Sequence, residues 1–305
     1  MLLDTGHQGQ ERMRIESFYE KDTGTWTYLL ADPGEGVAAV IDPVWEFDPV
    51  SGQAGEGFIR QALDAAVAMD CRIEWILETH AHADHLSAAN WLKQQTGARI
   101  ACGRGIQDVQ RTFAPVFNLP PPTATGGPFD RLLDEDDELQ LGSLTIRVMD
   151  TPGHTGDSIT YLVGDAAFIG DTLFSPAFGT ARCDFPGGDA GQLYDSIRKL
   201  YRLPRETRLF LCHDYPEAGG EPVRDITVEE SMQSNIHLSA ETSREDFVAM
   251  RTQRDGQLGL PRLILPSLQV NILGGAAPPA DCNGISYLRI PFNRSFKDLI
   301  EGEPK

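Results

Sequence analysis

The stretch THAHADH, residues 79–85, places His80, His82, Asp84 and His85 within a few positions. It directly follows RIEWILE, residues 72–78, whose apolar run predicts a buried strand. A lone histidine usually has a structural role. That explanation is weak here, because such a pattern arises by chance in roughly a few of ten thousand chains of this composition. Crowded imidazoles also oppose one another's protonation, whereas a bound metal keeps them neutral and uses their lone pairs.

Further predicted strands also end in side chains that can bind a metal. His154 follows residues 144–150, Asp171 follows residues 166–170, and His213 follows residues 207–212. Ligands gather at the carboxyl ends of strands in open α/β sheets, so these side chains are expected to meet. Imidazole and carboxylate together suit zinc, iron or manganese, and ligand type alone does not choose among them.

Composition excludes several classes of protein. The 305 residues include 45 acidic and 26 basic side chains, a formal charge of −19, so nucleic acid is not an expected partner. The five cysteines are widely spaced without a CxxC pair, which excludes a disulfide framework and a thiolate zinc site. Cys183 and Cys212 are interpreted as buried small apolar residues. Residues 1–14 show no targeting signal and no apolar run is long enough to span a membrane, so we expect a cytoplasmic protein.

The patterns predict one α/β domain over residues 1–305, with a core at about 13–215 and a C-terminal helical extension at about 216–305. Strands are expected at 13–20, 25–32, 37–42, 72–78, 98–103, 144–150, 158–170 (as a hairpin) and 207–212. Helices are expected at 57–70, 85–97, 191–202, 228–238 and 243–254. Loops are expected at 118–128 and 274–279. The acidic run at 134–138 is interpreted as a solvated turn rather than a cation site.

The order THAHADH, TPGHT, GDTLF and CHDY resembles the metallo-β-lactamase fold superfamily, over residues 13–215. The resemblance implies an αββα sandwich, in which two mixed β-sheets lie face to face with helices outside. Within that superfamily, GDTLFSPAFGTARCDFPGGDA followed by LCHDY resembles the persulfide dioxygenases. The segments TVEESMQSNIHLSA, REDFVAM and LPRLILP resemble the C-terminal helices and tail of the same family.

This resemblance implies one Fe(II) per chain, held by His80, His154 and Asp171. Two histidines and one carboxylate leave three coordination positions open. The expected substrates are glutathione persulfide and O2, and the expected products are sulfite and glutathione, a step in hydrogen sulfide detoxification. The surrounding residues would orient the ligands and carry protons: His82, Asp84, His85 and His213. In dinuclear relatives these positions bind a second metal, and the sequence leaves that possibility open.

The resemblance also implies a set of substrate-binding residues. Arg182 matches the family's substrate-binding arginine, and Tyr215 matches a tyrosine of the same pocket. His237 aligns with an arginine of the human member, which puts the identity of the thiol carrier in question. Cys183 replaces a threonine of that member. Because the chain is acidic, an anionic substrate requires basic residues gathered near the metal.

Two rival functions remain open. A glyoxalase II-type hydrolase of S-lactoylglutathione would use two metals and nearly all of the same ligands. A non-catalytic metal-binding or sensor module would have a closed site, often with cysteine ligands, whereas the candidate ligands here include no thiolate. A homo-oligomer is expected, with a dimer favoured, and family members often act beside rhodanese-type sulfurtransferases.

Overall fold

The computed structural model describes residues 13–120, 127–217 and 219–301. The interpretation of residues 1–12 as free of a targeting signal lies outside the described residues, as does the central part of the loop expected at 118–128. Over the described chain, no helix combines the length and apolar character needed to cross a membrane.

The first sheet joins the N-terminal meander to a parallel half, in the order β1-β2-β3-β6-β8-β9. Its strands are β1 (Arg14–Glu20), β2 (Thr25–Asp32), β3 (Val37–Ile41), β6 (Arg72–Leu77), β8 (Arg99–Gly103) and β9 (Arg131–Leu133). The first three pair antiparallel, as predicted, and β3, β6, β8 and β9 pair parallel. Parallel neighbours need crossover connections, and helices provide most of them here.

The second sheet runs in sequence order from β10 to β15. Its strands are β10 (Glu138–Leu141), β11 (Leu144–Asp150), β12 (Ile159–Val163), β13 (Ala166–Phe168), β14 (Arg208–Phe210) and β15 (Asp225–Thr227). A smaller sheet joins β4 (Val44–Asp48) to β5 (Gln53–Gly55) and β7 (Leu86–Ser87). The run at 134–138 forms an exposed turn, as predicted, and its acids pair with Arg104, Arg147 and Lys199.

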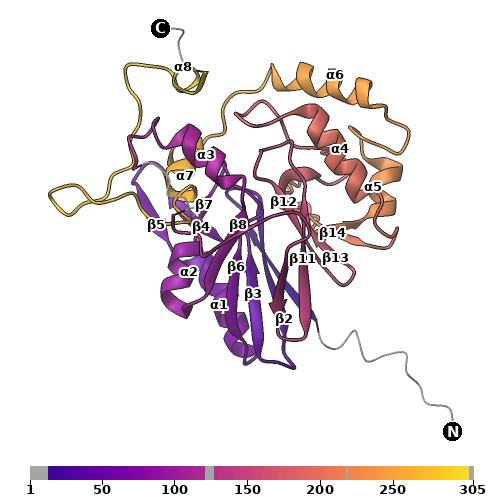
Figure 1. Cartoon of the computed structure of the whole chain (residues 1–305), viewed down its shortest axis with the longest axis horizontal. Helices are drawn as coiled ribbons and strands as arrows, with labels where there is room; N and C mark the ends of the chain where they lie inside the picture. Colours follow the sequence, from indigo (N-terminus) through magenta and orange to yellow (C-terminus); the bar gives the residue numbers. More distant parts are fainter. Residues whose placement is uncertain (1–12, 121–126, 218, 302–305) are drawn as a thin grey trace.

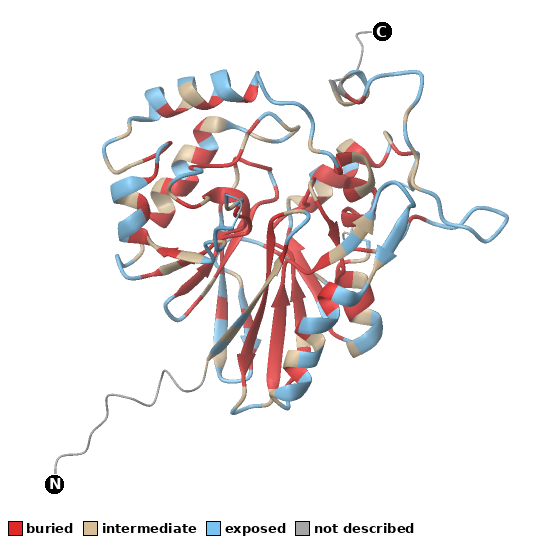
Figure 2. Cartoon of the chain, turned by 180° about the vertical axis from the view of Figure 1, so that it is seen from behind, coloured by how far each residue is buried: buried red, intermediate tan, exposed pale blue. Residues whose placement is uncertain are grey.

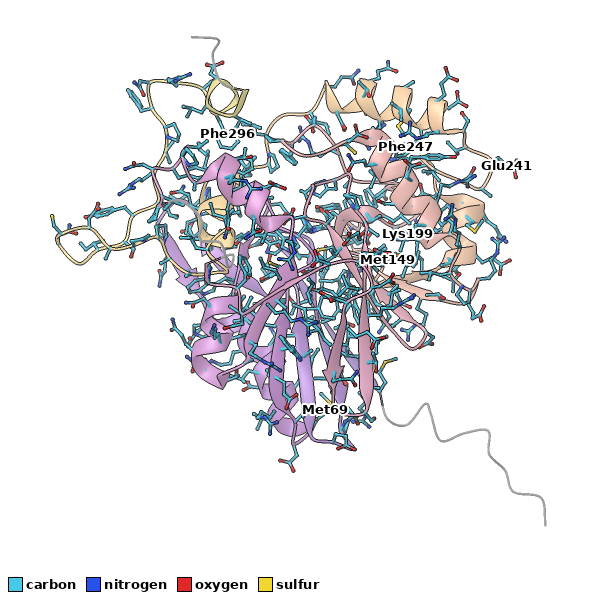
Figure 3. All side chains as sticks on the ribbon, in the orientation of Figure 1. Met69, Met149, Lys199, Glu241, Phe247 and Phe296 are labelled. Carbon is cyan, nitrogen blue, oxygen red and sulfur yellow. The ribbon has the colours of Figure 1, made fainter. Side chains whose placement is uncertain are left out.

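Helices cover the outer faces of both large sheets (Figure 1). The helices of the described chain are α1 (Gly57–Ala68), α2 (Ala89–Thr96), α3 (Ile106–Phe113), α4 (Ala190–Leu200), α5 (Val228–Ser234), α6 (Arg244–Asp255), α7 (Ile264–Asn271) and α8 (Phe296–Glu301). Helix α6 packs on α4, and Phe296 of α8 stacks on Phe113 of α3. One apolar core fills the space between the sheets, and two others lie under the helices. The strands are accordingly buried through their centres (Figure 2). Phe247 of α6, labelled in Figure 3, belongs to the core under α4. The predicted αββα sandwich is confirmed.

Several predicted boundaries were wrong. The helix expected from residue 85 begins at Ala89, because Leu86 and Ser87 instead pair with β4. The helix expected to end at residue 238 ends at Ser234. Helix α7 was not predicted, because most of its residues are buried and it shows no amphipathic periodicity.

The pairing of the strands brings the predicted ligands to one edge. Strands β11 and β13 both pair antiparallel with β12, and β14 is parallel to β13, so all three end on the same side. The backbone N–H of Ile159 donates to the carbonyl of Thr79 at 2.9 Å, which ties the end of β6 to that edge of the second sheet. The loops after β6, β11, β13 and β14 therefore converge.

Candidate metal centre

Three of the predicted ligands form one buried group. His80, His154 and Asp171 each offer a ligand atom within 4.8 Å of the other two. Oδ2 of Asp171 lies 3.5 Å from Nε2 of His154 and 3.9 Å from Nε2 of His80. Asp171 lies in η1 (Gly170–Thr172), a short 3₁₀ turn directly after β13. Two imidazoles and one carboxylate thus face a common point.

Hydrogen bonds fix which ring nitrogen faces that point. His154 donates from Nδ1 to the carbonyl of Arg182 at 2.7 Å, so its Nε2 keeps a lone pair. The hydroxyl of Thr79 donates to Oδ2 of Asp42 at 2.9 Å, and it therefore accepts from Nδ1 of His80, at 3.1 Å. Nε2 of His80 is left with its lone pair free. Both imidazoles are oriented as metal ligands.

Unpartnered atoms provide a test of whether these residues fit a metal ion. Nε2 of His80 and Oδ1 of Asp171 are buried and have no hydrogen-bond partner among the residues that the structure describes. Buried polar atoms are rarely left unpaired. Burial, together with the neighbouring imidazoles, also holds the pKa of His80 well below its ordinary value, so that the ring stays neutral. A cation coordinated here would satisfy both atoms, and the residues therefore fit a metal ion.

His82 faces away from the triad, although it lies between His80 and Asp84 in sequence. Its Nε2 is 3.1 Å from Oδ1 of Asp42 and 3.6 Å from Oε2 of Glu78. Burial opposes protonation of His82, but the Asp42 carboxylate raises its pKa well above the ordinary value. Sequence reasoning missed Asp42 and Glu78. The available signal was that each follows directly on a strand that leads toward the site.

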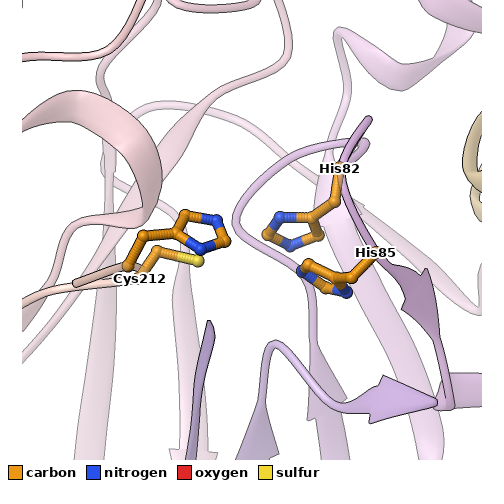
Figure 4. Close-up of side chains that lie close together, drawn as sticks. His82, His85 and Cys212 are labelled. Carbon is orange, nitrogen blue, oxygen red and sulfur yellow. The ribbon is translucent and has the colours of Figure 1, made fainter. Parts of the chain in front are cut away.

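The remaining predicted residues form a second buried group beside the triad. His82, His85, Cys212 and His213 offer ligand atoms within 4.8 Å of one another. Figure 4 shows Cys212 facing the rings of His82 and His85. Cys212 is buried, as predicted, but its thiol also belongs to this group of potential ligands.

Asp84 and His213 link the two groups. Nε2 of His213 lies 3.1 Å from Oδ2 of Asp84 and 3.4 Å from Oδ1 of Asp171. Burial opposes ionisation of Asp84, but the nearby His213 lowers its pKa to about 2. Burial opposes the charge on His213 in the same way, and the Asp84 carboxylate raises its pKa well above the ordinary value. Asp84 and His213 thus face each other at the edge of the triad.

A cavity of about 310 Å³ opens onto the triad at His154 and Asp171. Its walls combine aromatic and apolar residues with several polar ones. Those that the sequence predicted are Asp84, Arg182, Tyr215 and His237. Those that it missed include Phe174, Phe178, Thr180, Phe185, Arg251, Arg254, Leu258 and Pro261. Two further cavities, one beside Asp48 and the other beside Asp134, contain none of the triad. The 310 Å³ cavity is the candidate substrate pocket.

Arg182 lines this pocket, but its guanidinium group already has partners. Its Nε and Nη2 donate to the two carboxylate oxygens of Asp184 at 2.6 and 2.7 Å, and Nη1 donates to the carbonyl of Gly259 at 2.6 Å. The group also lies 4.8 Å from the ring centre of Phe185. Tyr215 stacks on His213 with ring centres 5.9 Å apart, and it remains 47% exposed.

His237 has a defined tautomer. The backbone N–H of Thr180 donates to its Nδ1 at 3.0 Å, so in the neutral ring the proton is on Nε2. Gly179, with φ of +84°, approaches this ring so closely that a Cβ there would lie 2.2 Å from Nδ1. Burial, followed by the charges of Arg251 and Arg254, lowers the pKa of His237 to about 4. The ring is therefore a neutral hydrogen-bond donor near pH 7.

Comparison with known proteins identifies the class. Residues 21–213 match the Metallo-beta-lactamase superfamily. The fold, the histidine cluster and the convergent strand ends agree with that match, and the chain belongs to the metallo-β-lactamase superfamily. Within it, the chain is 48% identical over 292 residues to a probable metallo-hydrolase of Burkholderia pseudomallei, covering 92% of this chain and 99% of that protein.

Other relatives carry two different names. Glyoxylase B2 of Dictyostelium discoideum is 39% identical, covering 92% of this chain and 98% of its own length. The human persulfide dioxygenase ETHE1 is 28% identical, covering 81% of this chain and 82% of its own length. The crystal structure of ETHE1 from Myxococcus xanthus superimposes with a TM-score of 0.69 at 29% identity, covering 87% of this chain and all of that one. The predicted family resemblance is confirmed.

Proposed function

We propose that the protein is a persulfide dioxygenase, which oxidises glutathione persulfide with O2 to sulfite and glutathione. The balanced reaction consumes one water and releases two protons for each persulfide. The observation that supports it best is the geometry of His80, His154 and Asp171, whose ligand atoms face one point at the base of an open pocket. Similarity to the ETHE1 proteins supports the same reaction.

The proposed cofactor is one Fe(II), held by Nε2 of His80, Nε2 of His154 and the carboxylate of Asp171. Ferrous iron supplies open coordination positions and the one-electron chemistry that reaction with O2 requires. Residues of the chain orient the two histidine ligands. The carbonyl of Arg182 and the hydroxyl of Thr79 hold the two imidazoles by their Nδ1 atoms. Such outer hydrogen bonds typically change affinity or activity about 10–100-fold when they are lost.

The pair of Asp84 and His213 is proposed to handle the protons. Asp84 lines the pocket, and the buried His213 lies 3.1 Å from Asp84 and 3.4 Å from Asp171. A proton taken up by Asp84 from the pocket can therefore pass to His213. The aromatic wall of Phe174, Phe178 and Phe185 surrounds the reacting end and limits the access of bulk water. The thiol carrier then occupies the outer pocket, where Tyr215 and His237 lie.

Oxygen consumption tests this proposal directly. Protein loaded anaerobically with Fe(II) is mixed with glutathione persulfide, and O2 uptake and sulfite are measured together. One sulfite for each O2 is the expected result. A matched control is the variant His154→Ala, which is expected to take up no O2. Iron-loaded protein that leaves the persulfide unoxidised would rule out the dioxygenase.

A glyoxalase II-type hydrolase is the second candidate, because the 48% identical relative is named a probable metallo-hydrolase. The group of His82, His85, Cys212 and His213 beside the triad gives a second metal a place to bind. Hydrolysis of S-lactoylglutathione by protein with two metals per chain would favour it. One iron per chain with persulfide oxidation favours the dioxygenase.

A further inference from the structure

The arginines around the candidate pocket differ in how they are neutralised. Arg182, Arg251 and Arg254 all line it. Arg182 is paired with Asp184 at 2.6 Å, and the buried Arg251 is paired with Asp255, also at 2.6 Å. Arg254 stands near the C-terminal end of α6 with its side chain exposed. Among the residues that the structure describes, it has no carboxylate partner.

His237 faces the same space. Its Nε2 carries a proton, is buried, and has no hydrogen-bond partner among the described residues. Arg251 and Arg254 line the same cavity as this ring. The wall of this one cavity thus contains an unused N–H donor and a cation that has no carboxylate partner among the described residues.

We propose that Arg254 and Nε2 of His237 form a carboxylate-binding subsite, in which a carboxylate of the persulfide's thiol carrier is held. This inference rests on the proposed function for the identity of the substrate as a persulfide. In this proposal, the carrier is a thiol that bears a carboxylate. Arg254, rather than Arg182, neutralises this carboxylate. A guanidinium group holds a carboxylate through two parallel hydrogen bonds, and the imidazole N–H adds a third.

Arg182 then has a structural role in the pocket wall. Its contacts with Asp184, Gly259 and the ring of Phe185 join the pocket wall to the segment after α6. To bind a substrate carboxylate, Arg182 would have to give up the two hydrogen bonds to Asp184, which would leave that acid beside the incoming anion. Arg254 can bind the carboxylate without breaking any ion pair.

Binding of glutathione and of its diethyl ester tests this subsite. Calorimetry is performed on iron-loaded protein without O2, so that no turnover occurs. The ester keeps the tripeptide but lacks both carboxylate charges. The wild-type protein is expected to bind glutathione about three- to thirtyfold more tightly than the ester. Arg254→Gln should remove this preference by weakening glutathione binding alone, and Arg254→Lys should restore part of it.

The matched control is Arg244→Gln. Arg244 lies on the same helix and carries the same charge, but it faces Asp195 at 3.3 Å and does not line the pocket. It should leave the preference unchanged. His237→Ala should reduce the preference and His237→Gln, which keeps an N–H donor, should reduce it less. An equal loss of affinity for glutathione and its ester in Arg254→Gln would overturn the assignment. A loss confined to glutathione that appears in Arg182→Gln instead of Arg254→Gln would overturn it as well.

The outcome for the subsite is separate from the outcome for the reaction. Glutathione binding is measured without persulfide. A loss of affinity in Arg254→Gln that affects glutathione but not its ester therefore supports the subsite, even in protein that fails to oxidise glutathione persulfide. Conversely, persulfide oxidation that is normal in Arg254→Gln, with an unchanged KM, contradicts the subsite and leaves the dioxygenase intact.

Discussion

His80 and His82 are near neighbours in sequence, yet their rings serve different groups. His80 keeps its free nitrogen toward His154 and Asp171, whereas His82 is held between Asp42 and Glu78. The alternation of side chains along an extended segment would place both on one face. The buried acids decide otherwise, because an uncompensated buried carboxylate costs several kcal/mol.

At this scale, the division between ligands and surrounding residues can be tested by iron content. Asp171→Ala removes a ligand and is expected to abolish iron retention. His213→Ala is expected to leave iron bound and to slow turnover by roughly 10–100-fold. Iron per chain is measured after gel filtration, and circular dichroism confirms folding. Equal loss of iron from both variants would show that ligands and surrounding residues are misassigned.

His237 predicts a pH dependence of stability. Its pKa is lowered from 6.5 to about 4 in the folded chain, so the unfolded chain binds the proton more tightly. The stabilisation is complete above pH 6.5 and is lost as the pH falls toward 4. The free energy of unfolding should fall by up to about 1.4 kcal/mol per pH unit in this window. Urea unfolding at several pH values measures it, and His237→Asn should lose this component. Parallel pH curves for the two proteins would contradict the assignment.

Helix α6 carries both a structural and a proposed substrate-binding arginine. Arg251 is buried, is paired with Asp255, and donates to the carbonyl of Thr180 at 3.1 Å. Asp255 in turn accepts from the backbone N–H of Cys183 at 2.8 Å. This network attaches α6 to the strand-end segment that supports the pocket. Arg254, three positions on, is left to face the solvent side of the same pocket.

Arg251→Met is therefore expected to destabilise the protein by about 3–5 kcal/mol, because it leaves Asp255 buried and unpaired. Arg244 is exposed on the same helix, and Arg244→Met should lower the free energy of unfolding by only about 0–1 kcal/mol. Denaturant unfolding compares the two. The double variant Arg251→Met with Asp255→Leu should recover much of the loss. Similar small effects for Arg251 and Arg244 would show that the buried pair does not anchor α6.

For the whole molecule, the site lies where the two sheets meet. His80 follows a strand of the first sheet, and His154 and Asp171 follow strands of the second. A metal held by all three would cross-link the halves of the sandwich. Because the unfolded chain lacks this arrangement, metal binding adds to the stability of the fold.

Iron should accordingly raise the melting temperature. At a free concentration a hundred times the Kd, binding contributes about 2.7 kcal/mol, which corresponds to a rise of roughly 5–10 °C in Tm. Calorimetry with and without Fe(II), under anaerobic conditions, measures it. Asp171→Ala should show no rise, and His213→Ala should keep most of it. A rise of the same size in Asp171→Ala would place the metal elsewhere.

Sequence patterns alone were enough to predict the class of fold and the set of candidate ligands. Strand patterns are local, and each ligand directly follows a predicted strand, so their convergence could be expected from the geometry of sheets. The aromatic and basic residues that line the pocket were harder to predict from the sequence. Arg251 and Arg254 come from a helix far along the chain from the triad, and no local pattern indicates which way its arginines face.

Which atoms of these residues are free to bind a metal or a substrate depends on contacts between distant segments of the folded chain. The ring of His82 is held by acids that follow two separate strands, and the guanidinium group of Arg182 is held by Asp184 and by the distant Gly259. The physical reason is that spacing along the chain sets where a side chain starts, whereas its partners depend on segments brought together by packing. Hydrogen bonds and ion pairs act over a few ångströms, and the sequence does not contain those distances.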